Sequence, residues 1–289
     1  MVKLHDCPVC SGTQFSPYLQ CTDHTVSQET FSIVRCTACG FLLTNPRPEN
    51  ADLGRYYKSE QYISHSNTSK GWVNQMYKIA RRFTLAQKYR LVKPYAQQSG
   101  LLDIGCGTGA FMNYCAEKGL KVEGVEPDDD ARRFAQSEYG FALKTEADLD
   151  VWSAGQFSAI TMWHVLEHVP NLQERIAQLK RLLDAQGRVF IAVPNHTSAD
   201  AQHYKEFWAA YDVPRHLWHF SPSTIRSLFN KQGFVLERTL PMKLDAYYVS
   251  LLSERYKKGS AVNALWQGFR SNWKADDDSW SSQIYVFKK

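Results

Sequence analysis

The chain has 289 residues, 44% of them hydrophobic, and a formal net charge of +5. It is long enough for one α/β domain of about 200 residues with a small appendage, and its charge neither requires nor excludes a nucleic-acid partner. No run of about eighteen apolar residues occurs and the N-terminus lacks the pattern of a signal peptide, so we expect no membrane span and a cytoplasmic protein.

Four of the seven cysteines form two CxxC pairs near the N-terminus: Cys7, Cys10, Cys36 and Cys39. Paired CxxC motifs can place four thiolates around one Zn²⁺, and residues 15–34 between them alternate as a small hairpin would. A cytoplasmic location disfavours two disulfides, and duplication of the motif disfavours a redox pair. We therefore expect a structural zinc ribbon over residues 1–48, in which four thiolates leave no coordination position open for catalysis.

Residues 49–98 are expected to form a linker and an amphipathic helix that caps the active site. The segment Asn45-Pro-Arg-Pro48 favours extended chain at the end of the ribbon. Residues 72–95 then have the pattern of one long helix rich in lysine and arginine. A solvated basic face is the simpler interpretation, and a surface that follows nucleic-acid phosphates is the alternative.

A short apolar strand at 101–104 runs directly into three alternate glycines, Gly105, Gly107 and Gly109, and then into a helical pattern. Glycines leave room for a ligand at this junction, and the amides that open the helix point toward it. A second apolar strand ends in Glu126, about twenty residues on, where an acid can accept hydrogen bonds from ribose hydroxyls. Together with Asp103, these residues predict a nucleotide-like cofactor site.

Strand and helix patterns alternate from residue 99 to the end, which predicts a Rossmann-like α/β domain with helices on both faces of a mostly parallel sheet. Ligands of such sheets bind at the carboxyl ends of the strands. Seven strands are expected, at 101–104, 121–126, near Phe141, and at 157–163, 187–193, 234–240 and 283–287. Helices are expected at 110–118, 127–139, 172–184 and 222–232, with a further helical region before the last strand.

The glycine segment resembles motif I of the class I S-adenosylmethionine (SAM)-dependent methyltransferases, with Glu126 at the position of their ribose-binding acid. Its third glycine comes one position sooner than in the dinucleotide pattern, which favours SAM over NAD. The segment Trp163-His-Val-Leu-Glu-His168 resembles the region after strand four of ubiquinone-type O-methyltransferases, and Pro214 to Pro222 resembles the loop before their sixth strand. A zinc ribbon joined to this domain also resembles the deoxysugar C-methyltransferases.

The resemblance implies further contacts to SAM. Trp163 and His164 are expected to line the cofactor pocket, and Asp148 or Leu149 to contact the adenine. The acceptor is expected to contact Arg215, which stands where the sugar enzymes carry an acid, and Tyr62, by resemblance to an aromatic position in those enzymes.

Methyl transfer to a hydroxyl or an acidic carbon requires removal of a proton, for which a histidine is suited. Five histidines are expected on the rim of the site: His164, His168, His196, His216 and His219. His216 is the first candidate for the base, since a related histidine in the sugar enzymes supplies it, and His168 and His219 are the other candidates. A purely structural His216, bonded to Asp212 or to a backbone carbonyl, is the alternative.

These observations predict a methyltransferase acting on a small-molecule hydroxyl or sugar-like carbon in secondary metabolism or surface-glycan assembly. An RNA methyltransferase assisted by the zinc ribbon, and a SAM-binding interaction protein without turnover, are the alternatives. An amino-directed enzyme is disfavoured because Met162-Trp-His-Val stands where such enzymes have N/D-P-P-Y. The sequence predicts no particular oligomeric state.

Overall fold

The structure is a computed structural model that describes residues 1–57 and 72–289, with the side chains of α2 described from residue 82 onward. Tyr62, one of the two expected acceptor residues, lies outside the described residues. Among the described residues, no helix is long and apolar enough to cross a membrane.

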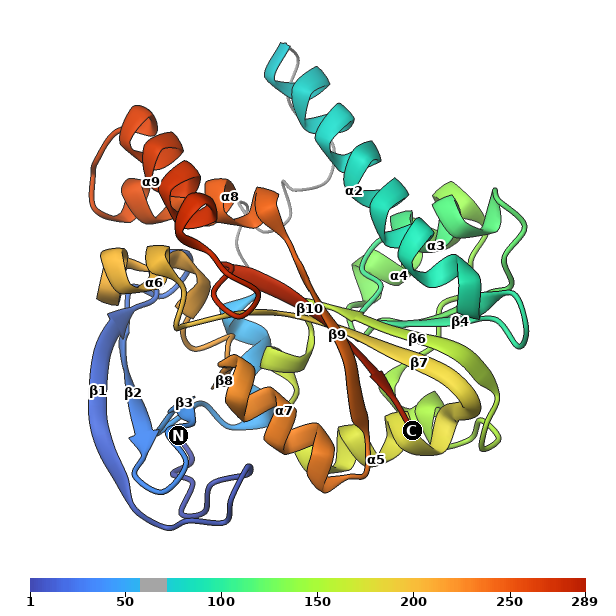
Figure 1. The fold of residues 1–289 in the computed structure, drawn as a ribbon, viewed down its shortest axis with the longest axis horizontal. Coiled ribbons are helices and arrows are strands. Elements are labelled where there is room, and N and C mark those ends of the chain that lie inside the picture. The colour runs from blue at the N-terminus through green and yellow to red at the C-terminus, as the bar shows by residue number, and fades with distance from the viewer. Residues whose placement is uncertain (58–71) are drawn as a thin grey trace.

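A six-stranded sheet runs through the centre of the molecule in the order β5-β4-β6-β7-β10-β9 (Figure 1). Its strands are β4 (Leu101–Ile104), β5 (Val122–Val125), β6 (Phe157–Trp163), β7 (Leu183–Pro194), β9 (Val235–Pro241) and β10 (Ser282–Lys288). β10 is antiparallel to both of its neighbours, and the pairs among β5, β4, β6 and β7 are parallel. The predicted mostly parallel sheet is therefore confirmed.

The seventh expected strand, near Phe141, is absent from the described residues. A single bridge between Lys144 and Val125 takes its place beside β5. Pairing ends there because Thr145 and Asp148 form a capping box that begins the short helix η2 (Glu146–Leu149).

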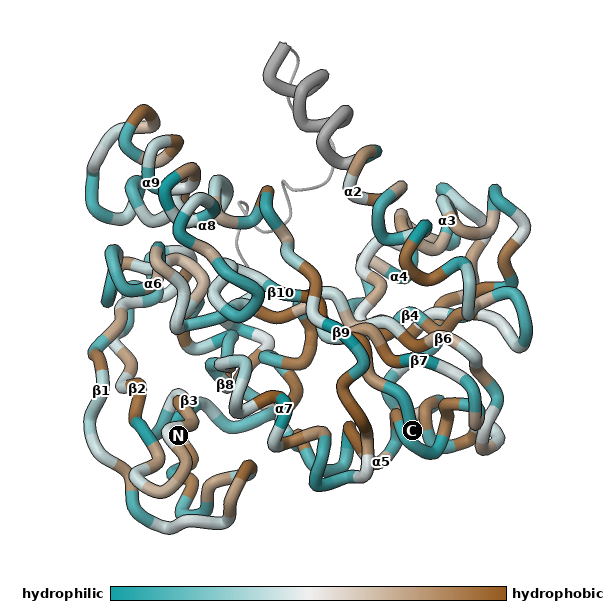
Figure 2. The backbone as a smooth tube through the Cα atoms, viewed as in Figure 1, coloured by the Kyte–Doolittle hydropathy of each residue, from teal (hydrophilic) through white to brown (hydrophobic). Residues whose placement is uncertain are grey.

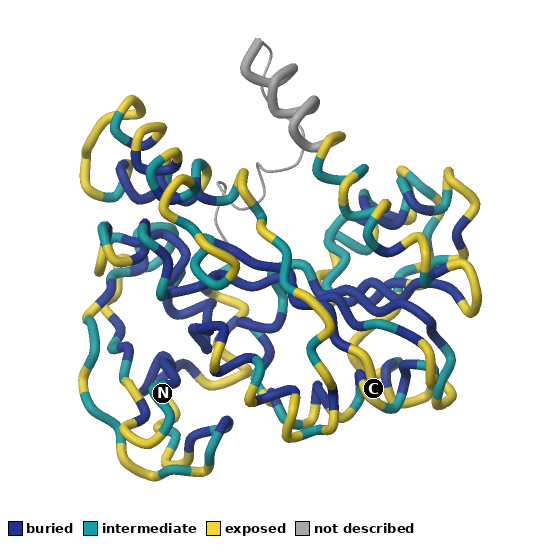
Figure 3. Tube along the Cα trace, viewed as in Figure 1, coloured by how far each residue is buried: buried dark blue, intermediate teal, exposed yellow. Residues whose placement is uncertain are grey.

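Helices cover both faces of the sheet because alternate strand residues point to opposite sides. On one face, residues such as Ile160 and Met162 pack with α5 (Leu172–Leu182) and α7 (Pro222–Lys231). On the other, Ala159 and its neighbours pack with two further helices, α2 (Trp72–Ala96) and α3 (Ala110–Ala116). Figure 2 shows the apolar strands and Figure 3 their burial. This burial of apolar strands between two helical layers fixes the strand ends that carry the site.

The N-terminal residues form a second sheet, in the order β1-β2-β3-β8. β1 (Phe15–Thr22) and β2 (Thr30–Cys36) form the antiparallel hairpin that the sequence predicts, and β3 (Leu42–Thr44) adds to it. The fourth strand, β8 (Trp218–His219), comes from the loop before α7. The N-terminal sheet therefore includes a strand from the same part of the chain that forms the central sheet.

The remaining elements connect the strands of the two sheets. Short helices are η1 (Asn50–Tyr56), η3 (Leu166–His168), η4 (Lys205–Phe207) and η5 (Ala209–Tyr211). Longer ones are α4 (Asp129–Tyr139), α6 (Ala199–Tyr204), α8 (Lys243–Tyr256) and α9 (Ala261–Lys274). α8 and α9 form a hairpin inserted between β9 and β10, and they lie on the same side of the sheet as α2 (Figure 1).

Candidate active site

The glycine turn after β4 has a backbone that other residues would strain. Gly105, Gly107 and Gly109 all have positive φ angles, of 69°, 55° and 77°. A Cβ atom on Gly105 would also lie 2.4 Å from a methyl group of Val165. The three glycines are thus required by the conformation of the turn, as expected for a close approach of backbone to a ligand.

Glu126 follows β5 and its carboxylate lies directly on this turn. The Gly107 amide donates to Oε2 at 2.7 Å and the Asp128 amide donates to Oε1 at 3.0 Å. Burial raises the pKa of Glu126, and the two amides oppose that shift. The structure therefore brings the predicted ribose-binding acid and the glycine turn together.

Asp103, at the end of β4, is buried beneath the same turn. The Thr161 hydroxyl donates to its Oδ1 at 2.6 Å. Burial raises the pKa of Asp103 to about 7, while the Thr161 hydrogen bond and the positive charge of Lys88 oppose that shift. The Lys88 ammonium, on α2, lies 4.4 Å from the ring centroid of Trp163, so α2 adds a cation at the cofactor edge that the sequence analysis missed.

Two other expected cofactor residues have different surroundings. Trp163, at the end of β6, packs edge-on against Phe111 at 5.6 Å, and its buried indole Nε1 has no hydrogen-bond partner among the described residues. Asp148 instead accepts hydrogen bonds from the amide and hydroxyl of Thr145, at 2.8 and 2.9 Å. One oxygen of its carboxylate, Oδ2, therefore takes part in starting η2.

A cavity of about 680 Å³ opens beside the carboxyl ends of the strands, and it is lined by α8 and by the loop before β8. His164, His216, Asp212 and Asp245 contribute its polar groups. Val249 and Leu252 from α8 give it an apolar wall. Its size and mixed lining suit a small organic molecule.

His216 has a tautomer fixed by its backbone contact. Its Nδ1 lies 2.8 Å from the carbonyl oxygen of Ala210, which can only accept, so Nδ1 carries a proton, and in the neutral ring the lone pair is on Nε2. Nε2 lies 4.0 Å from a carboxylate oxygen of Glu167 and 4.0 Å from one of Asp212. A histidine in this state can take a proton at Nε2 and hold the resulting charge between two acids.

Glu167, within η3, is fully buried, and neither of its carboxylate oxygens has a hydrogen-bond partner among the described residues. Burial raises its pKa, but contact with the His164 cation lowers the pKa by more. The carboxylate therefore stays negative at the centre of three histidines. Its sequence signal was weak, because a glutamate within a turn is ordinarily exposed.

His164 forms the other side of this cluster. Its backbone has a φ angle of 59°, and its ring nitrogens lie 2.9 Å from Asp245 and 3.3 Å from Glu167. Burial lowers its pKa, but the two acids outweigh burial and raise the pKa to about 10. His164 is therefore a cation at neutral pH, and it joins β6 to the start of α8.

His168 packs edge-on against His216, with ring centroids 4.6 Å apart. Its Nδ1 lies 2.9 Å from the Tyr57 hydroxyl and 3.1 Å from the carbonyl oxygen of Arg215. Burial is the main cause that lowers its pKa to about 4, so it is neutral near pH 7. His168 contacts the candidate base from behind and is not among the residues that line the cavity.

His219 and His196 lie outside the cavity lining. His219 is buried in β8, where its Nε2 lies 3.1 Å from the Thr44 hydroxyl, and burial lowers its pKa well below the usual value. His196 is buried beside Tyr18, and burial lowers its pKa to about 4. Both histidines serve the contact between the ribbon and the central sheet.

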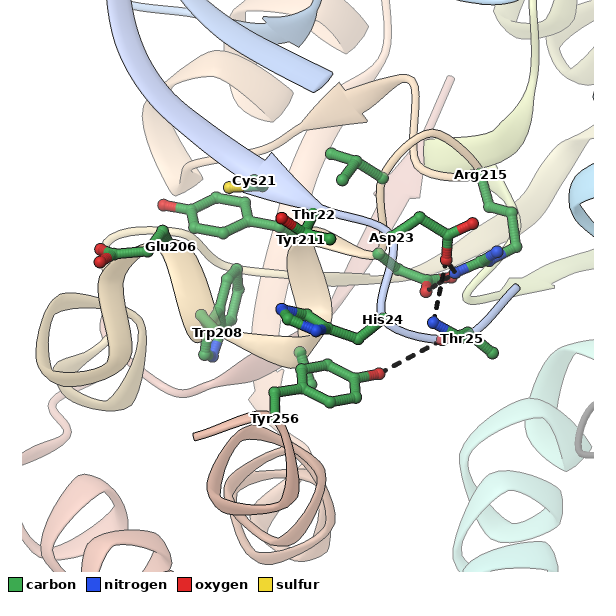
Figure 4. A pocket seen from close by; sticks show the side chains of 13 residues that line it. Cys21, Thr22, Asp23, His24, Thr25, Glu206, Trp208, Tyr211, Arg215 and Tyr256 are labelled. Carbon is green, nitrogen blue, oxygen red and sulfur yellow. Dashed lines mark hydrogen bonds and ion pairs between the residues drawn. The ribbon is translucent and has the colours of Figure 1, made fainter. Parts of the chain in front are cut away.

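Arg215 lines the cavity, but its guanidinium donates hydrogen bonds to other residues of the protein (Figure 4). It donates to both oxygens of Asp212 at 2.9 and 2.6 Å, to Asp23 at 2.9 Å and to the Tyr56 carbonyl at 2.8 Å. The space beside it in Figure 4 holds about 10 Å³, enough for one water. Arg215 is thus a buried link between the turn after β1, which carries Asp23, and the loop before β8.

The four predicted zinc ligands come together at one end of the ribbon, and all lie as free thiols within 4.8 Å of one another. The Cys7 and Cys39 sulfurs are 3.6 Å apart, and those of Cys10 and Cys36 are 3.5 Å apart. Two sulfurs bound tetrahedrally to one Zn²⁺ would be about 3.8 Å apart. The sulfur positions therefore fit a closed four-thiolate site.

Comparison with known proteins agrees with this geometry. A family model described as "Methyltransferase domain" matches residues 76–239, more than half of the chain. The chain belongs to this methyltransferase family. In this chain the turn after β4 carries the three glycines, and Glu126, which follows β5, accepts a hydrogen bond from that turn.

Several proteins are similar to this methyltransferase. The ubiquinone biosynthesis O-methyltransferase of Nitrosococcus oceani is 28% identical over 188 residues, which cover 60% of this chain and 77% of the relative. The protein of that name from Pseudomonas aeruginosa is 32% identical over 102 residues, 33% of this chain and 44% of the relative. Thus the chain spans less than half the length of the Pseudomonas protein.

A solved geranyl diphosphate methyltransferase in complex with SAM has a similar fold, with a TM-score of 0.51 and 18% identity. The match covers 84% of this chain and 95% of that one. At this identity the likeness shows the shared fold alone.

Proposed function

We propose that this methyltransferase transfers the methyl group of SAM to a hydroxyl or an acidic carbon of a small molecule, with His216 as the general base. The observation that carries the proposal is the contact between His216 Nδ1 and the Ala210 carbonyl, which leaves Nε2 as a proton acceptor on a residue that lines the cavity. The relatives named O-methyltransferases support a hydroxyl acceptor. The resemblance to sugar enzymes supports a sugar-like carbon.

SAM would be held by the glycine turn, with its ribose hydroxyls on Glu126 and its edge near Asp103, and it supplies an electrophilic methyl group. The Glu126 carboxylate accepts one amide on each oxygen and keeps further lone pairs for two hydroxyls. Lys88 and Trp163 would close the cofactor site from the α2 side. Asp148 keeps one carboxylate oxygen that Thr145 does not engage, so an adenine contact from Asp148 or Leu149 stays a prediction.

The chain's own contribution to catalysis is position and proton transfer. The acceptor must lie between the glycine turn and His216, so that its nucleophilic atom faces the methyl group in line. As that atom attacks, Nε2 of His216 takes its proton, and the resulting imidazolium is stabilised by Glu167 and Asp212 at 4.0 Å. His168 and the Ala210 carbonyl hold the ring in place.

We also propose that the four-cysteine cluster binds one structural Zn²⁺. The sulfur separations support it, and so does the small size of the ribbon, which needs a metal to supplement its core. The zinc has no role in the proposed transfer, because four thiolates fill its coordination shell.

The proposed base is tested with labelled SAM, first to find an acceptor among metabolite fractions and then to compare variants on that acceptor. His216→Gln should keep its SAM affinity and lose turnover by a factor on the order of 10² to 10⁴. His203→Gln, outside the cavity lining, is the matched control. Equal turnover of His216→Gln and the parent protein would exclude His216 as the base, and methylation of RNA alone would overturn the small-molecule assignment.

A further inference from the structure

The outward face of α9 is apolar, the reverse of an ordinary surface helix (Figures 2 and 3). Five large side chains with helical spacing are at least half exposed, and we call them the apolar stripe: Val262 (78%), Leu265 (53%), Trp266 (59%), Phe269 (50%) and Trp273 (76%). The buried face of the helix is small or polar: Ala264, Gln267, Gly268 and Ser271. An exposed apolar surface of this extent indicates an interaction site.

The helix cannot turn its apolar side inward, because its buried face is fixed. Gly268 approaches α8 so closely that a Cβ atom there would lie 2.9 Å from the Cα of Tyr247. The Ser271 hydroxyl donates to the buried Asp200 carboxylate at 2.6 Å. These two contacts hold α9 in the orientation that exposes the stripe.

The same helical hairpin carries most of the chain's excess positive charge. Residues 243–274 contain six basic and two acidic side chains, while the whole chain has a net charge of +5. Both acids are engaged inside the protein: Asp245 pairs with His164 at 2.9 Å, and buried Glu254 accepts from Asn263 at 2.5 Å. The exposed basic residues are Lys243, Arg255, Lys257, Lys258 and Lys274.

We propose that the apolar stripe and the lysines around it dock on the surface of an anionic lipid bilayer. Aromatic and aliphatic side chains on one face of a helix enter the interfacial layer, and neighbouring lysines pair with lipid phosphates. A second copy of this chain fits less well, because two faces of the same positive charge repel each other. Single-stranded nucleic acid also fits less well, because Val262 and Leu265 cannot stack on bases.

The docking surface adjoins the acceptor cavity, since α8 lines that cavity with Tyr248, Val249 and Leu252. An acceptor with a lipid tail could therefore enter from the bilayer. The docking proposal itself does not depend on which acceptor is methylated, or on His216.

The test is co-sedimentation of the full chain with vesicles of phosphatidylcholine alone or with added phosphatidylglycerol, at low and high salt. We expect at least tenfold stronger partitioning into the anionic vesicles, reduced at high salt. Trp266→Ser combined with Trp273→Ser should weaken partitioning by at least tenfold. Lys257→Gln and Lys274→Gln should each weaken it by about fivefold, which is the effect of about 1 kcal/mol per lysine.

Val151→Ser and Val235→Ser, at exposed apolar positions outside the hairpin, are the matched controls and should partition like the parent protein. SAM affinity measured by calorimetry confirms that each variant is folded, independently of any turnover. The proposal is overturned by equal partitioning of the tryptophan variant and the parent, by absence of binding to both vesicles, by a dimer that the tryptophan substitutions dissociate, or by retention on RNA in place of lipid.

Discussion

At the scale of single residues, the active site is a set of ionisable side chains whose protonation states are set by one another. Glu167 remains negative chiefly because the His164 cation lies against it. His164 and His168, four positions apart, have pKa values of about 10 and about 4, because only His164 has two acids against its ring. Near pH 7, His164 is thus a cation and His168 is neutral.

Loss of Glu126 should weaken SAM binding by about 1.5 to 3 kcal/mol, because charge-assisted hydrogen bonds to the ribose are removed. Calorimetry of Glu126→Ala measures this. Glu117→Ala, at an exposed acid just after α3, is the control. Unchanged affinity in Glu126→Ala would move the ribose to another group.

His164 should make the fold's stability depend on pH in the alkaline range. Its folded-state pKa of about 10 lies above the value of about 6.5 for a free histidine, so the paired cation contributes fully below about pH 6.5. That contribution is lost as the pH rises through about 10. Urea unfolding at about pH 6 and pH 10 should therefore show a smaller alkaline loss in His164→Gln than in the parent protein.

His203→Gln, whose imidazole lies outside the cluster, should retain the alkaline loss of the parent. An equal loss in His164→Gln and the parent would show that His164 is not held as a cation.

At the scale of elements, regular strands and helices were predictable from the sequence, and irregular segments were not. The ribbon hairpin, the helices after each central strand and the glycine turn follow from periodicity and from cap residues such as Asp128 and Ser221. Strand β8 was missed because two residues carry no periodic signal, and its pairing with β3 depends on tertiary contact. The expected strand near Phe141 was wrong because a capping box ends the pairing after one bridge.

In the candidate site, too, some contacts were predictable from the sequence and others were not. Glu126 and the glycines were predictable because their spacing along the chain sets their contact. The links of Glu167 to three histidines and of Lys88 to Trp163 join segments that are distant in sequence, so no local pattern reports them. Arg215 was assigned to the acceptor from its loop, and only the fold reveals its buried partner Asp23.

Removal of the metal tests whether Zn²⁺ stabilises the N-terminal ribbon. We expect one Zn²⁺ per chain by elemental analysis, and a lower melting temperature after chelation. Cys36→Ser should lose the metal, whereas Cys21→Ser, at a buried thiol outside the cluster, should retain it. Substoichiometric zinc in gently purified protein, or a disulfide between Cys7 and Cys10, would contradict the assignment.

At the scale of the whole molecule, the ribbon and the central sheet are joined through the active-site loop. Arg215 pairs with Asp23 in the turn after β1 and with Asp212; Arg215 and Asp23 are buried, and Asp212 is partly buried. The loop that carries His216 is therefore held by a contact with the N-terminal sheet.

Arg215→Met should lower the free energy of unfolding by about 3 kcal/mol, because it leaves buried Asp23 and partly buried Asp212 without a cationic partner. Urea denaturation measures the loss. The triple variant Arg215→Met, Asp23→Leu, Asp212→Leu should recover part of it, because no buried charge remains. A single variant as stable as the parent would show that the guanidinium contributes nothing to folding.

The pairing of β3 with β8 has a consequence for the order of events during synthesis. Leu42 and Leu43 leave the ribosome long before Trp218 and His219, the residues that complete their sheet. Until then one edge of β3 has no partner, and the nascent chain must hold an open strand edge that is prone to wrong pairing. An early metal ion on the cysteines would stabilise the first hairpin through that interval. The N-terminal sheet can therefore close only after the loop that carries His216 has been made.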